Sequence, residues 1–314
     1  MSSSTAVRTR PAYRPYAATV AEVQRLSPHF VRVAFTGPDF DVFGTAGLDQ
    51  RVKLILPLAD GSLSDIGQHD DEVIDAGDWY TAWRDIPSAT RSPLRTYTVR
   101  RVDPAARRLL VDFVVHHDAG PAGAWAEQAV AGQQIVVVGP DQRSEGFRLG
   151  LDWHPGTARR VVLAGDETAA PAISAILESL DESYAVDAFI EVPTAADFLD
   201  LELPEGFRVS WLARGDRAHG AALTEAVTSW CEGAPEVLAA AAAPRRQVLA
   251  DVDVDVDLLW ESPEDSEGDF YAWMAGEAAM VKGLRRHLVQ GCGVDRKRVA
   301  FMGYWRLGQS ERQE

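Results

Sequence analysis

The pattern of hydrophobic and polar positions divides the chain into two halves of different character. In the first half, apolar positions come in short runs that alternate with polar ones, which is typical of antiparallel strands with one solvated face. With a short helix at Ala122–Val130, these runs predict a closed antiparallel β-barrel. The expected strands are Ala17–Arg25, His29–Thr36, Gln50–Leu56, Arg95–Val102, Leu109–His116 and Gln134–Val138, the fourth and fifth forming a hairpin.

The stretch Ala59–Ser92 interrupts this series of strands. It is rich in Asp, Gly and Ser and has no clear hydrophobic period. We therefore expect a long surface excursion without regular structure.

The second half contains continuous apolar runs, which are typical of strands buried on both faces. Strands alternating with helices predict a doubly wound, mostly parallel α/β sheet. We therefore place a barrel domain at 1–150 and an α/β domain at 151–314. The expected strands are Arg160–Ala164, Ala185–Val192, Arg208–Ala213, Asp269–Ala275 and Arg298–Gly303, and the expected helices are Ala170–Leu180, Ala221–Cys231 and Ala278–Gln290.

One region fits the α/β pattern poorly. An Ala-rich segment, Leu238–Ala243, precedes the alternating run Asp251–Asp257, and we interpret residues 235–268 as an insertion. The Asp/Val alternation has two interpretations. It is either a metal-binding edge or a solvated edge strand or loop whose charges oppose aggregation.

Composition narrows the classes of function. The 314 residues carry a formal net charge of -16, which argues against a nucleic-acid-binding protein. No apolar run approaches the roughly 20 residues of a membrane helix, and Met1–Arg14 lacks the apolar core of a signal peptide. We therefore expect a cytoplasmic protein with a frayed start.

Cysteine and histidine usage bears on metals and redox groups. Two cysteines, Cys231 and Cys292, are too few for a disulfide framework or a cysteine-ligated iron–sulfur cluster. We interpret them as buried small hydrophobic residues. The seven histidines show no familiar zinc spacing, so we expect no protein-bound metal. Any redox chemistry then needs a bound organic cofactor.

The run Arg95-Thr96-Tyr97-Thr98 offers such a cofactor several contacts. A guanidinium can clamp a phosphate, a tyrosine ring can stack on a flavin, and the next hydroxyl or amide can reach flavin N5. The alternative is a plain amphipathic barrel strand.

A second element follows about twenty residues later, in FVVHHDAGPAGAWA (113–126). A strand ends, Gly120-Pro121 turns the chain, and a helix begins whose first amides attract phosphate. A pyrophosphate would fit between Arg95 and the amides of Ala122–Ala124. The alternative is an ordinary strand-to-helix turn, but the two elements together predict a cofactor site.

These motifs resemble those of the siderophore-interacting proteins, the FAD-dependent ferric-siderophore reductases within the ferredoxin–NADP reductase superfamily. The resemblance extends over nearly the whole chain, in the expected order. The least similar parts are Leu238–Gly268 and the Asp-rich loop Ala59–Asp78. The motifs are RTYT, FVVHHDAGPAGAWA, LAGDETAAPAISAIL (163–177), AWMAGEAAMVKGLRRHL (272–288) and GYWRLG (303–308).

The resemblance implies FAD on the barrel and a nicotinamide nucleotide on the α/β domain. The residues that it assigns to FAD in the first half are Arg95, Thr96, Tyr97, Thr98, His116, Gly120, Pro121, Ala122 and Trp125.

In the second half, the family's glycine-rich nucleotide turn corresponds to Gly165–Thr168. Its two carboxylates would repel a pyrophosphate, which leaves Asp166 and Thr168 to contact FAD instead. Gly276, Glu277 and Trp305 would lie beside the nicotinamide and the flavin. Glu277 has an equal alternative, a first-turn acid that the helix dipole favours.

The implied substrate is a ferric siderophore, which is often an anion and needs positive charge on so acidic a protein. The candidates are Lys53, Lys282, Arg285 and Arg306. For each of these residues singly, the alternative is surface solubility. The substrate hypothesis requires the fold to bring Lys53 to the same place as at least one of the others.

The implied reaction passes electrons from NAD(P)H through FAD to Fe(III), and we assign no catalytic acid or base. The donor is NADH, NADPH or a ferredoxin. Glu191 follows the pattern of acids that bind a ribose, which weakly favours NADH. Two alternatives remain: a general NAD(P)H–flavin oxidoreductase, and a non-catalytic module that binds a siderophore or a flavin.

Overall fold

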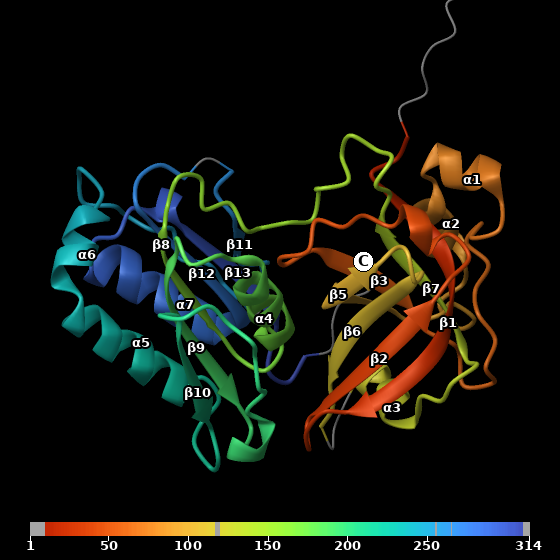
Figure 1. The fold of residues 1–314 in the computed structure, drawn as a ribbon, viewed down its shortest axis with the longest axis horizontal. Helices are drawn as coiled ribbons and strands as arrows, with labels where there is room; N and C mark the ends of the chain where they lie inside the picture. Colours follow the sequence, from red (N-terminus) through yellow and green to blue (C-terminus); the bar gives the residue numbers. More distant parts are fainter. Residues whose placement is uncertain (1–9, 117–119, 255, 265, 310–314) are drawn as a thin grey trace, which may run out of the picture. The chain divides into compact units, whose positions relative to one another are not determined.

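The structure is a computed structural model that describes residues 10–116, 120–254, 256–264 and 266–309 (Figure 1). The chain forms two compact units. The first consists of the described parts of 1–24, 32–113 and 117–150. The second consists of 25–31, 114–116 and the described part of 151–314, so two short segments of the first half belong to it.

The first unit is built on a curled antiparallel sheet of seven strands in the order β4-β3-β7-β1-β2-β6-β5. The strand β1 begins at Tyr13, inside the stretch expected to be frayed, and residues 1–9 lie outside the described part. The strands are β1 (Tyr13–Arg25), β2 (Phe30–Thr36), β3 (Arg51–Ile55), β4 (Leu94–Thr98), β5 (Arg101–Asp103), β6 (Arg108–Val114) and β7 (Gln134–Pro140).

The hairpin expected from Arg95–Val102 and Leu109–His116 is wrong in part. Its first strand is divided into β4, which pairs with β3, and β5, which pairs with β6. Between them, the Val99 amide donates to the Gln50 carbonyl at 2.8 Å and the Arg100 amide donates to the Leu110 carbonyl at 2.9 Å. One continuous run therefore forms both edges of the curled sheet.

The excursion Ala59–Ser92 is also more regular than expected, because it contains α1 (Asp71–Ala76) and α2 (Trp79–Asp85). Asp70 caps α1 by accepting the amides of Glu72 and Val73. Trp83 of α2 is fully buried, and its indole N–H donates to the Ser92 carbonyl. The excursion is thus anchored to the barrel by a hydrophobic cluster of Ile55, Ile66, Trp83, Leu94, Val136 and Val138.

The second unit is a six-stranded sheet in the order β10-β9-β8-β12-β13-β11. All neighbouring strands are parallel except β11, which runs antiparallel to β13. The strands are β8 (Arg160–Gly165), β9 (Ala185–Val192), β10 (Arg208–Ala213), β11 (Trp260–Glu261), β12 (Phe270–Glu277) and β13 (Val299–Trp305).

Helices cover both faces of this sheet, with α4 on one face and α5 and α7 on the other (Figure 1). The strand order reverses between β8 and β12, and such a switch point is where open α/β sheets bind ligands. Besides α1 and α2, the described α-helices are α3 (Pro121–Gln128) in the first unit and α4 (Ala170–Ser179), α5 (Ala221–Gly233), α6 (Pro235–Ala240) and α7 (Ala278–Arg285) in the second.

One feature of the second unit departs from the predicted elements. The expected helix Ala278–Gln290 is α-helical only to Arg285 and continues as a π-helical turn, Arg286–Gly291. The described part of Asp251–Asp257 is a loop, one of the two forms expected for it, and the Asp251 carboxylate lies 2.8 Å from Lys282 Nζ. No helix among the described residues is long and apolar enough to cross a membrane.

A buried carboxylate fixes the segment 25–31 within the second unit. Asp197 is fully buried and accepts hydrogen bonds from Ser27 Oγ at 2.7 Å and from the backbone amide of His29 at 2.9 Å. It also accepts from Thr194 and lies 2.8 Å from His29 Nδ1. Burial alone would raise the pKa of Asp197, but these donors outweigh it and lower the pKa.

We expect Asp197→Ala to cost about 3–5 kcal/mol of unfolding free energy, because it leaves several buried donors without an acceptor. The measurement is urea unfolding followed by tryptophan fluorescence. The control is Asp181→Ala, since Asp181 makes similar bonds to Ser183 but is exposed. That change should stay within about 0.5 kcal/mol.

The same substitution has a pH signature. Because folding lowers the pKa of Asp197, its stabilisation is present above the unfolded pKa and is lost as pH falls through the folded pKa. The difference between wild type and Asp197→Ala should therefore shrink in acid. Equal unfolding midpoints for the two alanine variants at neutral pH would contradict this role.

Candidate functional site

The first group of candidate residues lies on adjacent strands of the barrel. Arg95, Thr96 and Tyr97 are half-buried on β4, and Thr98 is buried. Lys53 stands opposite Thr96 in the β3–β4 register, and its Nζ donates to Thr96 Oγ1 at 3.1 Å. The Arg95 guanidinium donates to the Leu94 carbonyl at 2.8 Å.

An aromatic series links β4 to α3. The Tyr97 and Phe113 rings lie 4.5 Å apart, Phe113 and Trp125 lie 5.6 Å apart, and Trp125 stacks on Phe35 at 6.2 Å. The indole nitrogen of Trp125 is buried and has no hydrogen-bond partner among the described residues. A buried N–H of this kind costs free energy unless a ligand or water satisfies it.

The start of α3 is open to a ligand. Gly120 precedes the helix without any side-chain cap, and a Cβ placed on Gly120 would meet no described atom within 4 Å. Pro121 and the buried Ala122 begin the helix. The residues 117–119 of the predicted motif lie outside the described part.

These features fit an aromatic cofactor that carries phosphate groups. The unsatisfied indole N–H of Trp125 and the uncapped amides of α3 offer donors, the Tyr97 ring offers a stacking surface, and Arg95 offers a positive charge. The observation that tests the fit most directly is the buried indole nitrogen, because the described chain leaves its hydrogen bond unmade.

In the second unit, the carboxylate of Asp166 forms the centre of a hydrogen-bond network. Asp166 follows β8 and is fully buried. Its Oδ1 accepts from the amide and hydroxyl of Thr168 at 2.9 and 2.6 Å. Its Oδ2 accepts from the Glu277 amide at 2.7 Å and from Trp305 Nε1 at 2.9 Å. The structure thus brings together Asp166, Thr168, Glu277 and Trp305.

Two local features make this convergence possible. Gly276 has φ +140, and a Cβ there would lie 2.6 Å from Asp166 Oδ2, so only glycine lets the carboxylate approach. The β12–β13 register shifts after Gly276, and this bulge places Trp305 opposite Glu277. The Glu277 side chain caps α7 by accepting the Met280 amide at 2.9 Å.

Three further polar residues surround Asp166. The guanidinium of Arg214 holds Glu167 through two hydrogen bonds of 2.9 Å. The Nε2 atom of His219 lies 3.5 Å from Glu167 Oε2 and 3.7 Å from Asp166 Oδ2. The His219 ring meets Trp305 edge-on, with centroids 5.0 Å apart.

The charges of this network shift several pKa values. Burial and the adjacent Glu167 raise the pKa of Asp166. Burial would also raise the pKa of Glu167, but His219 and Arg214 lower it to about 2. Burial would lower the pKa of His219, but the two carboxylates raise it. His116 reaches solvent, yet the surrounding protein partly desolvates it and lowers its pKa, with Glu167 opposing.

The expectation that Glu191 contacts a ribose is not supported by its surroundings. Glu191 is fully buried, and its carboxylate accepts the amides of Gly220 and Leu223 at 2.8 and 3.0 Å and lies 3.3 Å from Arg214. Glu191 therefore holds the start of α5, and the reason to prefer NADH is lost.

An open pocket of about 780 Å³ lies beside this network. It adjoins the start of α5 and the start of α7, at the sheet edge where parallel strands end, which is where α/β sheets bind ligands. Its lining includes Arg217, His219, Gly220, Thr224, Glu277, Met280 and Leu307.

The basic substrate candidates of the second unit already have partners. Lys282 pairs with Asp251, and Arg306 donates to the Asp257 carbonyl. Arg285 is buried, and its guanidinium donates twice to Glu261 and once to the Ala250 carbonyl. A substrate would reach Arg285 only after that pair had opened.

The fold of the chain is of the ferredoxin-reductase type. The ferredoxin reductase of carbazole 1,9a-dioxygenase shares this fold at 15% sequence identity, with a TM-score of 0.58 over 94% of this chain and 71% of that one.

Two family models match the two halves: "siderophore-interacting FAD-binding domain" over residues 19–144 and "siderophore-interacting protein" over residues 158–308. A siderophore utilization protein from T. fusca is 30% identical, with a TM-score of 0.67 over 96% of both chains. The chain belongs to the siderophore-interacting protein family, and FAD is the cofactor of its first domain.

Curated relatives agree with this assignment. An uncharacterised protein of Mycobacterium tuberculosis is 34% identical over 94% of this chain and 92% of its own length. The ferric vibriobactin reductase ViuB of Vibrio cholerae is 28% identical over 91% and 87%. The NADPH-dependent ferric-chelate reductase of Escherichia coli is 27% identical over 91% of both.

Sequence reasoning missed Arg214 and His219, and it gave Glu167 no role. A signal was available, since His219 lies in the loop Gly215–Gly220 between β10 and α5, at the strand ends where ligands bind. What the sequence did not show is that this loop returns to the carboxylates after β8.

We expect the two histidines near Glu167 to titrate on opposite sides of the ordinary histidine value of about 6.5. The pKa of His219 should lie above it and that of His116 below it. NMR titration of the imidazole protons measures both values. Glu167→Gln should lower the pKa of His219, because it removes a neighbouring negative charge.

The direction of the pKa shift of His219 determines how its contribution to stability changes with pH. Since folding raises the pKa of His219, its stabilisation is complete below the unfolded pKa and is lost as pH rises through the folded pKa. A His219 pKa at or below the ordinary value would contradict the charge arrangement described for this network.

Proposed function

We propose that this protein is a ferric-siderophore reductase that takes electrons from NAD(P)H and releases iron as Fe(II). The observation that supports this most is the cradle for FAD formed by β4 and α3, with its unsatisfied Trp125 nitrogen. This cradle lies in the domain that matches the siderophore-interacting FAD-binding family. Relatives named as ferric reductases support the same activity.

The side chains of the barrel hold and orient the cofactor in this proposal. Arg95 and the first amides of α3, at Ala122 and Gly123, neutralise the phosphates, while Tyr97 and Thr98 contact the flavin ring. Trp125 donates its indole N–H. When bound, FAD converts a two-electron donor into single-electron transfers to Fe(III).

Asp166 is a positioning residue in this proposal. Both of its oxygens are occupied by donors from Thr168, Glu277 and Trp305, so the carboxylate fixes their positions rather than contacting a phosphate. Gly276 keeps the backbone bare at this point. The rigid edge that results is where the cofactor-facing groups of the second unit are held.

The nucleotide is proposed to bind in the pocket at the starts of α5 and α7. The first amides of α5 are already bound by Glu191, so the positive charge that this pocket offers a phosphate comes from Arg217 in its lining. Arg217 is paired with Glu225, both side chains being at least half exposed, and such a pair exchanges partners at little cost. Glu191 does not discriminate between NADH and NADPH, so both are candidate electron donors.

The test of the proposed function is anaerobic stopped-flow spectroscopy on the purified holoprotein. NADH or NADPH should bleach the flavin absorption, and a ferric siderophore should restore it faster than a quinone does. A ferrous-specific chelator should trap iron in proportion. Reoxidation that is equally fast with the quinone would favour a general flavin oxidoreductase, and a flavin that neither nucleotide bleaches would indicate a binding module.

Arg95→Ala should weaken FAD binding by roughly 1.5–3 kcal/mol, because a charge-assisted phosphate contact is lost. The Kd, measured by fluorescence titration of the apoprotein, should rise about one to two orders of magnitude. Arg101→Ala is the matched control, since Arg101 is exposed on β5 of the same sheet. Equal FAD affinity in the two variants would remove Arg95 from the site.

We also propose that Lys53 in the first unit and Lys282 in the second each attract an anionic ferric chelate through their charge. Replacing both with Gln should raise KM for that substrate roughly two- to thirtyfold, because such charges contribute about 0.2–1 kcal/mol each. The effect should fade with salt as the screening length falls below about 8 Å. Flavin reduction by NAD(P)H should not change.

The control for this pair is Lys297→Gln, which removes an exposed positive charge from a different part of the second unit. The contribution of Asp251 is separable, since Asp251→Asn frees Lys282 from its partner and should lower KM. An unchanged KM in the Lys53/Lys282 double variant at low salt would show that these residues are ordinary surface charges.

A further inference from the structure

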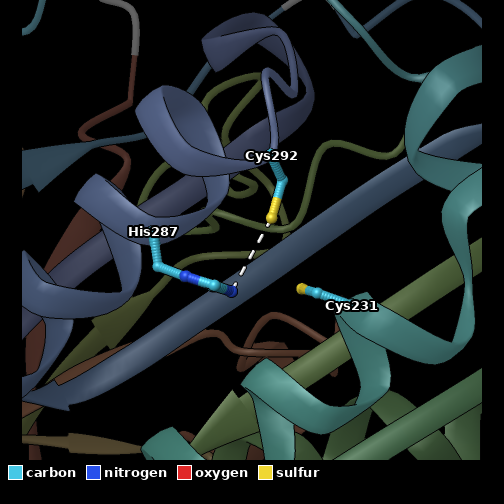
Figure 2. A group of neighbouring side chains, drawn as sticks. All are labelled: Cys231, His287 and Cys292. Atoms are coloured by element: carbon cyan, nitrogen blue, oxygen red, sulfur yellow. Dashed lines mark hydrogen bonds between the residues drawn. The ribbon is translucent and has the colours of Figure 1, made fainter.

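Two thiols and one imidazole, all of which can bind a metal ion, lie close together in the second unit, away from the network around Asp166 (Figure 2). Cys231 comes from α5, and His287 and Cys292 come from the π-helical end of α7. Their sulfur and nitrogen atoms all lie within 4.8 Å of one another, and Cys292 Sγ is 3.6 Å from His287 Nε2. The sequence alone gave no sign of this group, because the two cysteines are far apart along the chain.

The π-helical turn brings two of the three ligands together. The Cys292 amide donates to the His287 carbonyl at 2.9 Å, so the hydrogen bond spans five residues. In an α-helix, residues five apart point about 140° away from each other, and a chelating pair would not form. The π turn places them on one face, and such turns are frequent at functional sites.

The distances suit a tetrahedral metal ion. Metal–sulfur bonds of about 2.3 Å and metal–nitrogen bonds of about 2.0–2.1 Å at a tetrahedral angle separate sulfur from nitrogen by about 3.6 Å. The Cys292–His287 distance equals that value. The remaining ligand atoms lie close enough to reach the same geometry through side-chain rotation.

Charge and accessibility are also compatible with a metal ion. A divalent ion that displaces the two thiol protons leaves a core with no net charge, which can remain buried. Cys231 is buried, while Cys292 and His287 are partly exposed and give an ion a way in.

We propose that Cys231, His287 and Cys292 form a tetrahedral binding site for Zn²⁺, with the fourth position left for water or an added ligand. Two thiolates and one imidazole are a donor set that Zn²⁺ prefers. Binding exchanges two S–H bonds for two metal–sulfur bonds and releases two protons. The ion would join α5 to the end of α7, independently of FAD.

The test uses the tag-free FAD-loaded protein, reduced with a phosphine and freed of metal by a chelator. Zn²⁺ is titrated against a chromophoric chelator, and native mass spectrometry counts the ions. Co²⁺ serves as a spectroscopic probe, because thiolate ligation gives charge-transfer bands in difference spectra against the same flavoprotein. We expect one ion per chain and thiolate-to-cobalt bands.

Ligand variants give the decisive comparison. Cys231→Ser, Cys292→Ser and His287→Gln should each weaken binding by at least about a hundredfold, since even losing an outer hydrogen-bond partner of a metal ligand costs 10–100-fold. His69→Gln, which removes an exposed imidazole elsewhere, should have no effect. His287 is only partly buried, so its variant tests the site even if a cysteine variant fails to fold.

Several outcomes would overturn the proposal. These are the absence of one-to-one binding by the reduced wild type, cobalt bands that survive the loss of both cysteines, and full affinity in His287→Gln. A protein that shows no free thiols before reduction and binds no metal after it would identify the pair as a disulfide instead.

Discussion

The second unit depends on one buried carboxylate. Asp166 lies at the end of β8, and its two oxygens accept four hydrogen bonds from three other places in the chain: Thr168, Glu277 and Trp305. Without those donors, burial of the carboxylate would cost several kcal/mol. Because the donors come from the turn after β8, from the end of β12 and from β13, the same bonds that make burial tolerable also fix these strand ends to one another.

This arrangement explains why the strand ends carry unusual backbone. Gly276 has a positive φ that other residues rarely adopt, and it has no side chain to collide with Asp166. The β-bulge after it places Trp305 opposite Glu277, where its indole N–H reaches the same carboxylate oxygen. The neighbouring Glu167 would be a second buried charge, and it is balanced by Arg214 and His219. The sheet edge that faces the open pocket is therefore polar, but its charges balance one another. Such an edge suits residues that hold a ligand in place rather than exchange protons with it.

The parts of the fold that the sequence predicted are those in which a short local pattern has a single packing solution. The run RVVLAG of β8 is apolar on both faces, so a central parallel strand accommodates it. The helices α1 and α2 were missed because they are six and seven residues long, too short for a period to show. The run Arg95–Val102 was placed in one strand because its alternation does not reveal that the chain changes its partner strand after Val99.

The site residues divide in the same way, into those that local motifs indicate and those whose position depends on packing. Thr168, Gly276 and Trp305 were predicted from motifs, and the structure brings them to the same carboxylate, Asp166. Glu191 was misjudged because its position along β9 suggested a ligand-facing acid, whereas the amides of α5 occupy it. Cys231, His287 and Cys292 were beyond prediction because their proximity depends on a π turn, and nothing in local periodicity indicates one.

The basic residues of the second unit show why charge alone does not define a substrate site on an acidic protein. The exposed fraction is 23% for the side chain of Lys282 and 79% for that of its partner Asp251, so water can replace either and the pair holds weakly. For Arg285 it is 5%, and two hydrogen bonds join its guanidinium to Glu261, so opening that pair leaves a buried charge unmatched. Residues of the Asp-rich insertion thus bind both Lys282 and Arg285. Breaking the pair costs much more free energy at Arg285 than at Lys282. An anionic ligand that competes with the insertion gains access to Lys282 long before Arg285, which makes Arg285 a structural residue unless the insertion itself moves.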